Sequence, residues 1–315
     1  MWLPLVLATA LSEPSPADLV AAAASSVRPA ECWPARGEGG SAPDTLWSRA
    51  RTPGLGRYCA VLARSHARLA DSPALARTAA LAALELEPGR AAPHVALGRA
   101  ALGEGNLDEA LAQFDRAISI DARSVEHPFA LHDFANALRR SGRLEQARRA
   151  YGLLVPRTDL VPSRAWRAQV LLEAAHVAMA TSLASGKPAE LDEALAYLRE
   201  AALDPHQELR LDIALSLVLV LDRAQRTAQA DALLAELTPS ATWAARERPD
   251  YVARASDLEA LRALALERSA PAAATTRYKR LLDDPTVAEP WKQAIRARLS
   301  RLEKAPAPRP RRPTR

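Results

Sequence analysis

Aromatic and β-branched residues are scarce in this sequence. Phe, Trp and Tyr together make up 4% of the 315 residues, although hydrophobic residues make up 49%. The hydrophobic share is mostly Ala and Leu, which favour helices, whereas strands are enriched in the residue types that are rare here. We therefore predict an all-α protein.

Residues 1–303, the body of the chain, also lack an excess of charge of either sign. The formal net charge is +5, from 42 basic and 37 acidic residues. Five of the basic residues and none of the acidic ones lie in residues 304–315, K-A-P-A-P-R-P-R-R-P-T-R, so the remaining charges balance. A basic nucleic-acid groove across the body is therefore not expected. We expect residues 304–315 to be a disordered tail that either solubilises the chain or binds anionic surfaces.

Only two cysteines are present, Cys32 and Cys59. A structural zinc site needs about four ligands, so these two residues do not predict one. In an oxidising compartment they can form a disulfide, and in the cytosol they would be two small buried hydrophobic residues. The compartment decides between these two interpretations.

The N-terminus carries the one apolar run that points to a compartment. Residues Trp2–Leu11 resemble the apolar core of a secretory signal, although no basic residue precedes them. No other stretch approaches the roughly 20 apolar residues that span a bilayer. We predict a signal peptide at residues 1–12 and an exported, periplasmic or envelope-associated protein, with a cytoplasmic location as the alternative.

A pattern of small and large residues recurs along the chain at intervals near 34 residues. In its clearest copy, G-N-L-D-E-A-L-A-Q-F-D-R-A-I-S-I, a single helical face holds Ala110, Phe114 and Ala117. Alanines at the equivalent of position 110 recur in five further copies, at Ala76, Ala147, Ala194, Ala230 and Ala274. Such recurrence is the signature of a repeat architecture.

Another apolar-periodic helix precedes each copy, and in the best copy it places Gly98 before Ala110. In this the sequence resembles the tetratricopeptide repeat (TPR) family, whose small residues at these two positions let antiparallel helices approach closely. The resemblance implies a right-handed α-solenoid of antiparallel helix pairs over residues 57–303, with about six repeats and a capping helix from Glu289. Residues 13–56 are expected to form an N-terminal helix, around 17–27, and an irregular segment docked by two tryptophans, Trp33 and Trp47.

Two stretches depart from the repeat length. The sequence S-G-K-P-A-E-L-D-E, residues 185–193, is expected to form an enlarged turn. Ala230 and Ala274 are 44 residues apart, which predicts either an insertion or a longer helix between them.

The acidic residues of the best repeat do not indicate a catalytic site. Asn106 and Glu109 have the spacing of a capping box. Asp108 and Glu109 in the first turn also favour the helix dipole. The similar acids Asp192 and Glu193 of a later repeat favour the same capping role.

No motif for catalysis, cofactor binding or metal binding is complete. Glu173 and His176 have the E-x-x-H spacing of di-iron proteins, but no second copy exists in the sequence. For a cysteine nucleophile at Cys59, the one candidate base nearby in the sequence is His66. We predict a non-enzyme without cofactors, metals or a small-molecule substrate, and an enzyme based on Cys59 and His66 is the alternative.

The TPR resemblance also implies where partners bind, because the first helices of these repeats line a concave surface. The corresponding groove positions begin with Val95, and the candidate binding residues are Arg99, His132, Asn136 and Arg139. Equivalent positions in the fifth repeat are apolar, Leu215 and Leu219, which predicts a mixed polar-to-apolar groove rather than a full carboxylate clamp. We predict a protein–protein interaction scaffold of the bacterial cell envelope that binds proteins or peptides. A cytoplasmic TPR co-factor of a secretion or regulatory complex is the alternative.

Overall fold

The computed structural model describes residues 29–32, 53–185, 188–203, 208–237, 243 and 249–304. All regular secondary structure in these residues is helical, which confirms the predicted all-α fold. Several sequence-based predictions lie outside the described residues: the signal peptide (1–12), the helix around 17–27, the docking of Trp33 and Trp47, and the tail beyond residue 304.

The chain forms two compact units, residues 1–137 and 138–315. The described elements of the first unit are the 3-10 helix η1 (Ala30–Cys32) and the helices α3 (Pro53–Arg68), α4 (Pro73–Leu86), α5 (Ala91–Gly103), α6 (Leu107–Ile120) and most of α7 (Pro128–Arg140). The second unit holds α8 (Leu144–Leu154), η2 (Val155–Leu160), α9 (Arg164–Ser185), α10 (Pro188–Leu203), α11 (Arg210–Arg223), α12 (Thr227–Glu236), α14 (Ala255–Leu266), α15 (Pro271–Asp283) and α16 (Glu289–Lys304).

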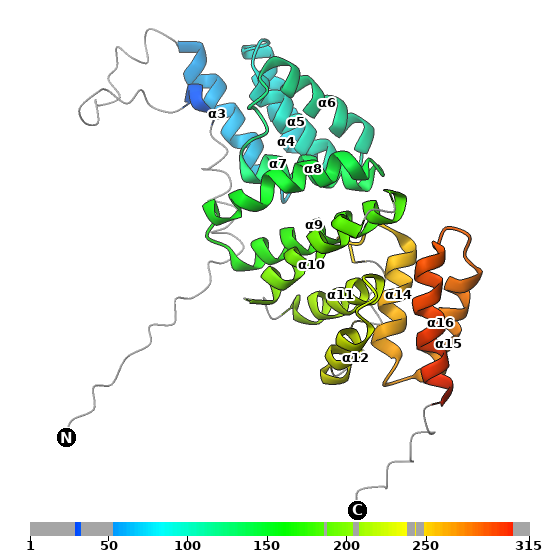
Figure 1. The fold of residues 1–315 in the computed structure, drawn as a ribbon. Coiled ribbons are helices and arrows are strands. Elements are labelled where there is room, and N and C mark those ends of the chain that lie inside the picture. Colours follow the sequence, from blue (N-terminus) through cyan, green and yellow to red (C-terminus); the bar gives the residue numbers. More distant parts are fainter. Residues whose placement is uncertain are drawn as a thin grey trace, which may run out of the picture. The chain divides into compact units, whose positions relative to one another are not determined.

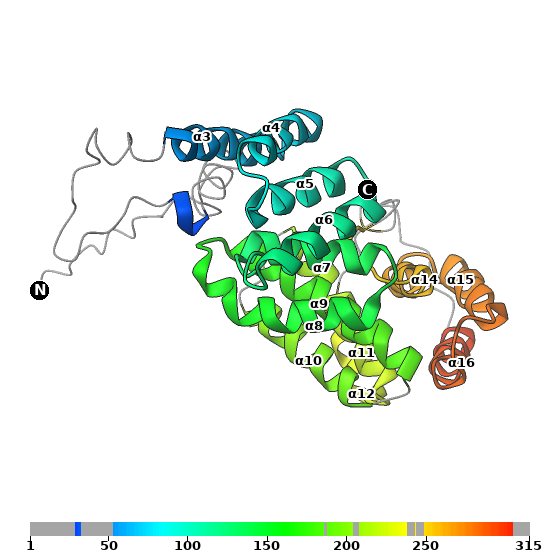
Figure 2. The ribbon, with the colours of Figure 1, turned by 90° about the horizontal axis from the view of Figure 1, so that it is seen from above.

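Within each unit, helices pack on their neighbours in the sequence, as Figures 1 and 2 show for the successive helices of that unit. The packed pairs are α3 with α4, α5 with α6, α9 with α10, α11 with α12, and α14 with α15. Helices α7 and α8 follow α6 in chain order, and α16 packs against α15. The described residues therefore contain the twelve helices and the closing helix that the predicted six repeats require. No helix among them is long and apolar enough to cross a membrane.

The pair α5 and α6 shows why small and large residues alternate. A Cβ atom on Gly98 would lie 3.1 Å from the carbonyl oxygen of Ala110 and 3.2 Å from the ring of Phe114. The missing side chain thus allows the close approach of the two helices. Phe114 is fully buried, and its ring centroid lies 5.4 Å from that of Phe134 in α7.

The predicted capping box at the start of α6 is confirmed. Asn106 Oδ1 accepts a hydrogen bond from the Glu109 backbone N–H at 3.3 Å, and Asn106 Nδ2 donates to Glu109 Oε2 at 3.0 Å. Glu109 also accepts a hydrogen bond from Arg77 of α4 at 2.8 Å. This contact links the second helices of two neighbouring pairs and was not predicted. The acids of this repeat therefore begin a helix and join it to its neighbour.

The predicted enlarged turn at residues 185–193 is wrong. Helix α9 continues to Ser185 and α10 begins at Pro188, in a first turn where proline is tolerated. Asp192 and Glu193 therefore lie beyond the first turn of α10 and do not cap it. They bind arginines of neighbouring repeats instead: Arg148 donates to Glu193 at 2.7 Å, and Asp192 pairs with Arg226 at 3.3 Å.

The extra residues between the fifth and sixth pairs are an insertion, because α12 ends at Glu236. Trp243 and Tyr251 from this insertion are 2% and 3% exposed and belong to the core of the second unit. The ring of Tyr251 lies 5.1 Å from that of His176 in α9. His176 Nε2 in turn lies 2.9 Å from the hydroxyl of Ser216 in α11.

Leu215 and Leu219 of α11 are buried in the same core cluster as these aromatic residues. The prediction that they give the groove an apolar part is therefore wrong. Burying apolar side chains stabilises the folded state, because it removes their surface from water. In this unit Leu215 and Leu219 are 1% and 6% exposed and pack into the protein's own core.

Several charged residues that are buried in the second unit are paired across its helices. Arg223 of α11 donates to Asp257 of α14 at 2.7 Å, and both side chains are at most 3% exposed. Arg298 of α16 pairs with Asp222 of α11 and, at 3.0 Å, with Glu267 after α14. Burial raises the pKa of Glu267. Buried charges of this kind need such partners, because a single unpaired ion would be costly.

Candidate binding cleft of the first unit

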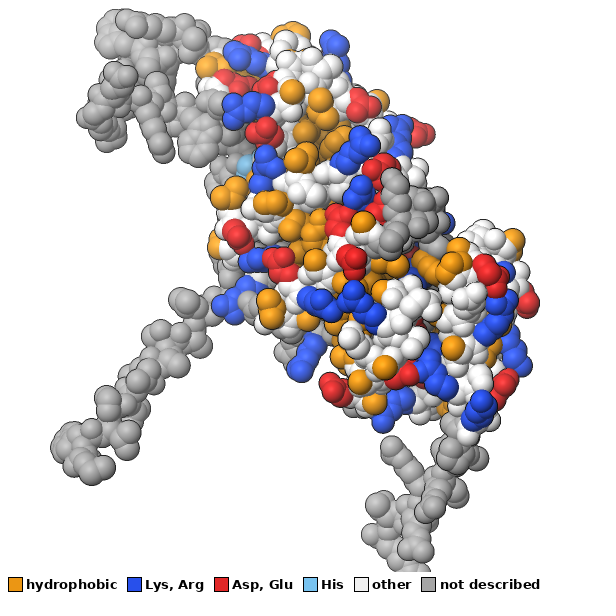
Figure 3. All heavy atoms as spheres, in the orientation of Figure 1, with side chains coloured by type: hydrophobic (Ala, Val, Ile, Leu, Met, Phe, Trp, Pro, Cys, Tyr) orange, Lys and Arg blue, Asp and Glu red, His pale blue; other side chains and the backbone are white. Residues whose placement is uncertain are grey.

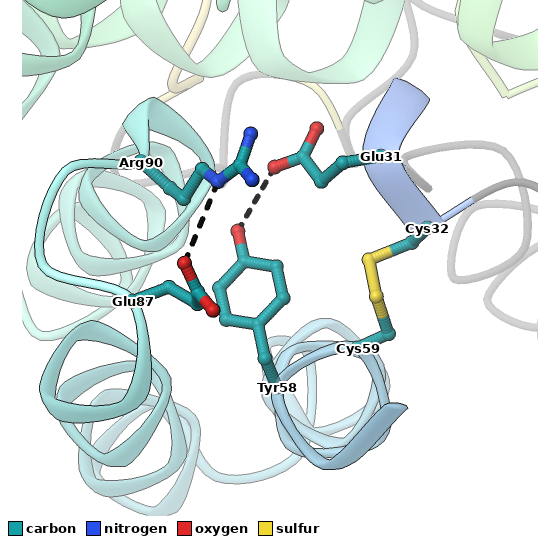
Figure 4. Close-up of a disulfide and its surroundings, with 6 residues drawn as sticks. All are labelled: Glu31, Cys32, Tyr58, Cys59, Glu87 and Arg90. Carbon is teal, nitrogen blue, oxygen red and sulfur yellow. Dashed lines mark hydrogen bonds and ion pairs between the residues drawn. A yellow bond between two sulfur atoms is a disulfide. The ribbon is translucent and has the colours of Figure 1, made fainter. Parts of the chain in front are cut away.

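The Cys32–Cys59 disulfide, one of the two predicted alternatives, is present and ties η1 to helix α3. The two Cα atoms lie 5.6 Å apart, and the residues are 27 positions apart in sequence. The fully buried Tyr58 reinforces the link, because its hydroxyl donates to Glu31 Oε1 of η1 at 3.1 Å (Figure 4). Burial raises the pKa of Tyr58, so the hydroxyl keeps the proton that it donates.

A cleft of about 450 Å³ lies beside this anchored segment. Its walls come from η1, the C-terminal end of α3, the start of α5 and the connection from α6 to α7. The lining residues include Glu31, His66, Arg90, Val95, Ser124 and His127. All of these residues belong to the first unit.

Arg99 of α5 connects the polar groups next to the cleft. Its Nε donates to Asp133 Oδ2 of α7 at 2.5 Å, and its Nη1 lies 3.5 Å from His66 Nδ1 of α3. His132 Nδ1 lies 3.8 Å from the other carboxylate oxygen of Asp133. The structure therefore brings Arg99 and His132 together, joined by Asp133, which was not predicted as a site residue.

The other two predicted groove residues lie further along α7. Asn136 is half-buried and does not line the cleft. Arg139 is 4% exposed, so it offers little surface to a ligand, and it belongs to the second unit, where its charge acts on Tyr151 and His176. A binding role for Arg99, His132, Asn136 and Arg139 stays a prediction.

The two histidines that line the cleft are uncharged at neutral pH. Burial, with a smaller contribution from Arg99, lowers the pKa of His66 to about 3. The same two causes lower the pKa of His127 to about 4. His127 is further fixed by the Phe129 backbone N–H, which donates to its Nδ1 at 3.3 Å.

Charged groups of both signs surround the cleft, and most are held by neighbours within the chain. Arg90 lies 3.7 Å from Glu87, and Arg123 lies 3.4 Å from Glu126. In Figure 4 the end of Arg90 also points toward Glu31. The molecular face in Figure 3 likewise shows basic and acidic side chains interspersed over the described atoms, in keeping with the balanced charge of the body.

Comparison with known proteins yields a fold similarity. No protein-family model and no curated protein matches the sequence. A solved structure described as "Functional Characterization of Pseudomonas Aeruginosa pilF" is similar, with a TM-score of 0.45 and 18% sequence identity. The alignment covers 78% of this chain and 99% of that one.

The arrangement does not support the alternative of a cysteine enzyme. Cys59 is bonded to Cys32 and carries no thiol that could act as a nucleophile. His66, its proposed base, contacts Arg99 instead. In the described part of the chain, no group of three or more His, Cys, Asp or Glu residues could hold a metal ion.

Sequence reasoning missed His127, Ser124 and Glu31 as cleft residues. His127 and Ser124 lie in a connection between repeats, where helical periodicity gives no position. Glu31 reaches the cleft because its neighbour Cys32 is bonded to α3. The pair of cysteines was the one sequence signal that could have placed this segment.

Proposed function

We propose that this protein is a non-catalytic interaction scaffold of the TPR type, which holds other proteins or peptides in the cleft of its first unit. The observation that carries the proposal is the cleft itself, about 450 Å³, beside which Arg99 and His132 meet through Asp133. The TPR resemblance of the sequence implied that partners bind along these first helices. A cleft of this size is in the range that holds a ligand or a short peptide segment.

The cleft is held in shape by the surrounding contacts, which favours binding. The disulfide and the Tyr58–Glu31 hydrogen bond fix η1, and the ion pair between Arg99 and Asp133 joins α5 to α7. A preformed surface loses less conformational entropy on binding than a mobile one. The site therefore suits recognition of a partner.

We further propose that the scaffold works in an oxidising compartment, such as the bacterial periplasm. The disulfide supports this location, because such bonds persist outside the reducing cytosol. Sequencing the N-terminus of the mature protein tests it. Loss of about the first 12 residues is expected, and an intact Met1 in the soluble cytosolic fraction would contradict export.

Affinity purification from the native organism tests the scaffold function. The wild-type protein is compared with the double variant Arg99→Ala/Asn136→Ala and with Asp115→Ala/Arg116→Ala, a control on the exposed face of α6. We expect the same partners with the wild type and the control, and fewer with the groove variant. If all three proteins, each shown to be folded, capture the same set, binding through this region is wrong.

A further inference from the structure

The two histidines of the cleft carry their protons on the same ring nitrogen. Arg99 is always protonated and can only donate, so His66 Nδ1, 3.5 Å away, is the acceptor. The Phe129 backbone N–H can also only donate, so His127 Nδ1 is an acceptor as well. A neutral imidazole whose Nδ1 accepts has its proton on Nε2. Both side chains are therefore Nε2–H donors.

Neither donor is used within the described residues. The hydrogen bonds of His66 and His127 there involve only Nδ1, while both rings line the cleft. Neither Nε2 atom is among the buried unpaired atoms of this part of the chain, so both are accessible from the cleft. An accessible N–H donor that the chain leaves unpaired suits a ligand that supplies acceptors.

The charges around the cleft indicate what kind of acceptor fits. Three acidic residues, Glu31, Asp121 and Glu126, line it together with two basic ones, Arg90 and Arg123. The nearby Arg99 is already paired with Asp133. With no excess of positive charge, the site does not favour a free carboxylate or phosphate. Uncharged carbonyl oxygens suit the neutral imidazole donors better.

The apolar part of the lining consists of small or compact side chains. These are Pro29, Ala91, Ala92, Val95 and Ile120. Such a wall can take the side chains of an extended polypeptide, while the backbone carbonyls of that polypeptide remain available to hydrogen-bond donors of the cleft.

We propose that the cleft binds an uncharged, extended segment of a partner polypeptide, whose main-chain carbonyl oxygens accept hydrogen bonds from the Nε2–H groups of His66 and His127. This inference rests on the proposed scaffold function and specifies its ligand. Recognition requires no chain end, so the bound segment can lie anywhere in a partner sequence.

The test uses the full-length, disulfide-bonded protein and a synthetic mixture of random hexapeptides with amidated C-termini. Peptides retained by the protein are identified by mass spectrometry. The best one is then made as an amide and as a free acid, and its affinity is measured by fluorescence anisotropy. We expect the amide and the acid to bind equally within about twofold, since the site has no excess positive charge.

Substitutions of His127 locate the contact. His127→Phe removes the donor and should weaken binding about 2- to 12-fold, the range of one hydrogen bond. His127→Gln keeps an N–H donor near the position of Nε2 and should restore most of the affinity. His94→Phe is the matched control, because His94 lies outside the cleft lining and its Nδ1 contacts Gln113.

Nuclear magnetic resonance of the protein labelled with ¹⁵N-histidine tests the tautomers without any ligand. Two-bond ¹H–¹⁵N correlations should show Nε2–H tautomers for both residues at pH 7. The His66→Gln and His127→Gln variants assign the signals. An Nδ1–H tautomer or a charged ring at either position would overturn the inference.

The binding outcomes separate this inference from the proposed function. Binding that needs the free acid, or that does not respond to His127→Phe, overturns the inference and leaves the scaffold function intact. The absence of any retained peptide overturns the inference too. Only the further failure of the Arg99/Asn136 variant to alter partner capture would count against binding through this region.

Discussion

Single residues set how closely the helix pairs approach, and Gly98 is the clearest case. Its missing Cβ leaves the space that the ring of Phe114 fills. Gly152 in α8 is also helical, but a Cβ placed there would meet nothing within 4 Å. Substitutions at these two glycines therefore separate the effect of packing on stability from the effect of helix propensity.

Gly98→Leu should destabilise the first unit by about 1–3 kcal/mol, the usual cost of overpacking. Gly152→Ala should stabilise the second unit by about 0.5–1 kcal/mol, because alanine favours a helix more than glycine does. Thermal unfolding followed by circular dichroism measures both changes. A Gly98→Leu variant as stable as the wild type would mean that α5 and α6 are not in close contact.

His176 makes the stability of the second unit depend on pH. Burial, with smaller contributions from Arg223 and Arg139, lowers its pKa to about 3. The unfolded chain, with a pKa near 6.5, binds this proton more readily. Stability should therefore fall as the pH falls from about 6.5 toward 3, by at most about 1.4 kcal/mol per pH unit from this residue.

Urea unfolding of the wild type and a His176→Phe variant between pH 7.5 and 4.5 measures this contribution. The variant should be less stable at pH 7.5, because it loses the contact with Ser216, but its stability should depend less on pH. The same pH slope in both proteins would show that folding does not lower the pKa of His176.

At the scale of elements, the disulfide determines whether η1 forms a wall of the cleft. Cys32→Ser should lower stability by roughly 3–4 kcal/mol, the loop-closure contribution expected for a loop of this length. It should also weaken peptide binding, because η1 contributes Glu31 to the lining. Thermal unfolding with and without reductant measures the first effect.

Thiol titration of the native protein checks the bond directly. We expect no reactive thiol before reduction and two after it. One reactive thiol in the native protein would contradict the bond and restore the case for an enzyme based on Cys59.

The ion pair between Arg223 of α11 and Asp257 of α14 is a fully buried charged link between elements. Asp257→Ala leaves the buried Arg223 without its partner and should cost about 3–5 kcal/mol. Asp192→Ala is the control, because its pair with Arg226 is exposed and should contribute about 0–1 kcal/mol. Urea unfolding compares the two variants, and equal effects would contradict the difference in burial.

The helix pairs could be predicted from the sequence because each one repeats the same spacing of small and large residues. The start of α10 could not, since Gly186 and Lys187 before Pro188 resemble a turn. The positions of Tyr251 and Glu31 depend on contacts with distant parts of the chain, which periodicity does not contain. Arg99 could be predicted next to the site because it lies in a helix with the repeat's periodicity. His127 was missed because it lies in a connection, where that periodicity gives no position.

At the scale of the whole molecule, positive charge is concentrated at one end of the sequence. Residues 304–315 carry five basic side chains, and the rest of the chain is balanced. If this segment binds anionic surfaces, the full-length protein should be retained on heparin in a salt-sensitive manner. A variant without residues 304–315 should elute early. Unchanged retention would show that the tail does not bind.

The proposed function depends on partners binding in the cleft of the first unit. Photo-crosslinking in cells tests this binding in place, with benzoylphenylalanine at Arg123, which lines the cleft and is 82% exposed, or at Arg116 on the exposed face of α6. We expect discrete adducts with other proteins from position 123 and none from position 116. Adducts of equal yield from both positions, or adducts from position 116 alone, would contradict binding in the cleft.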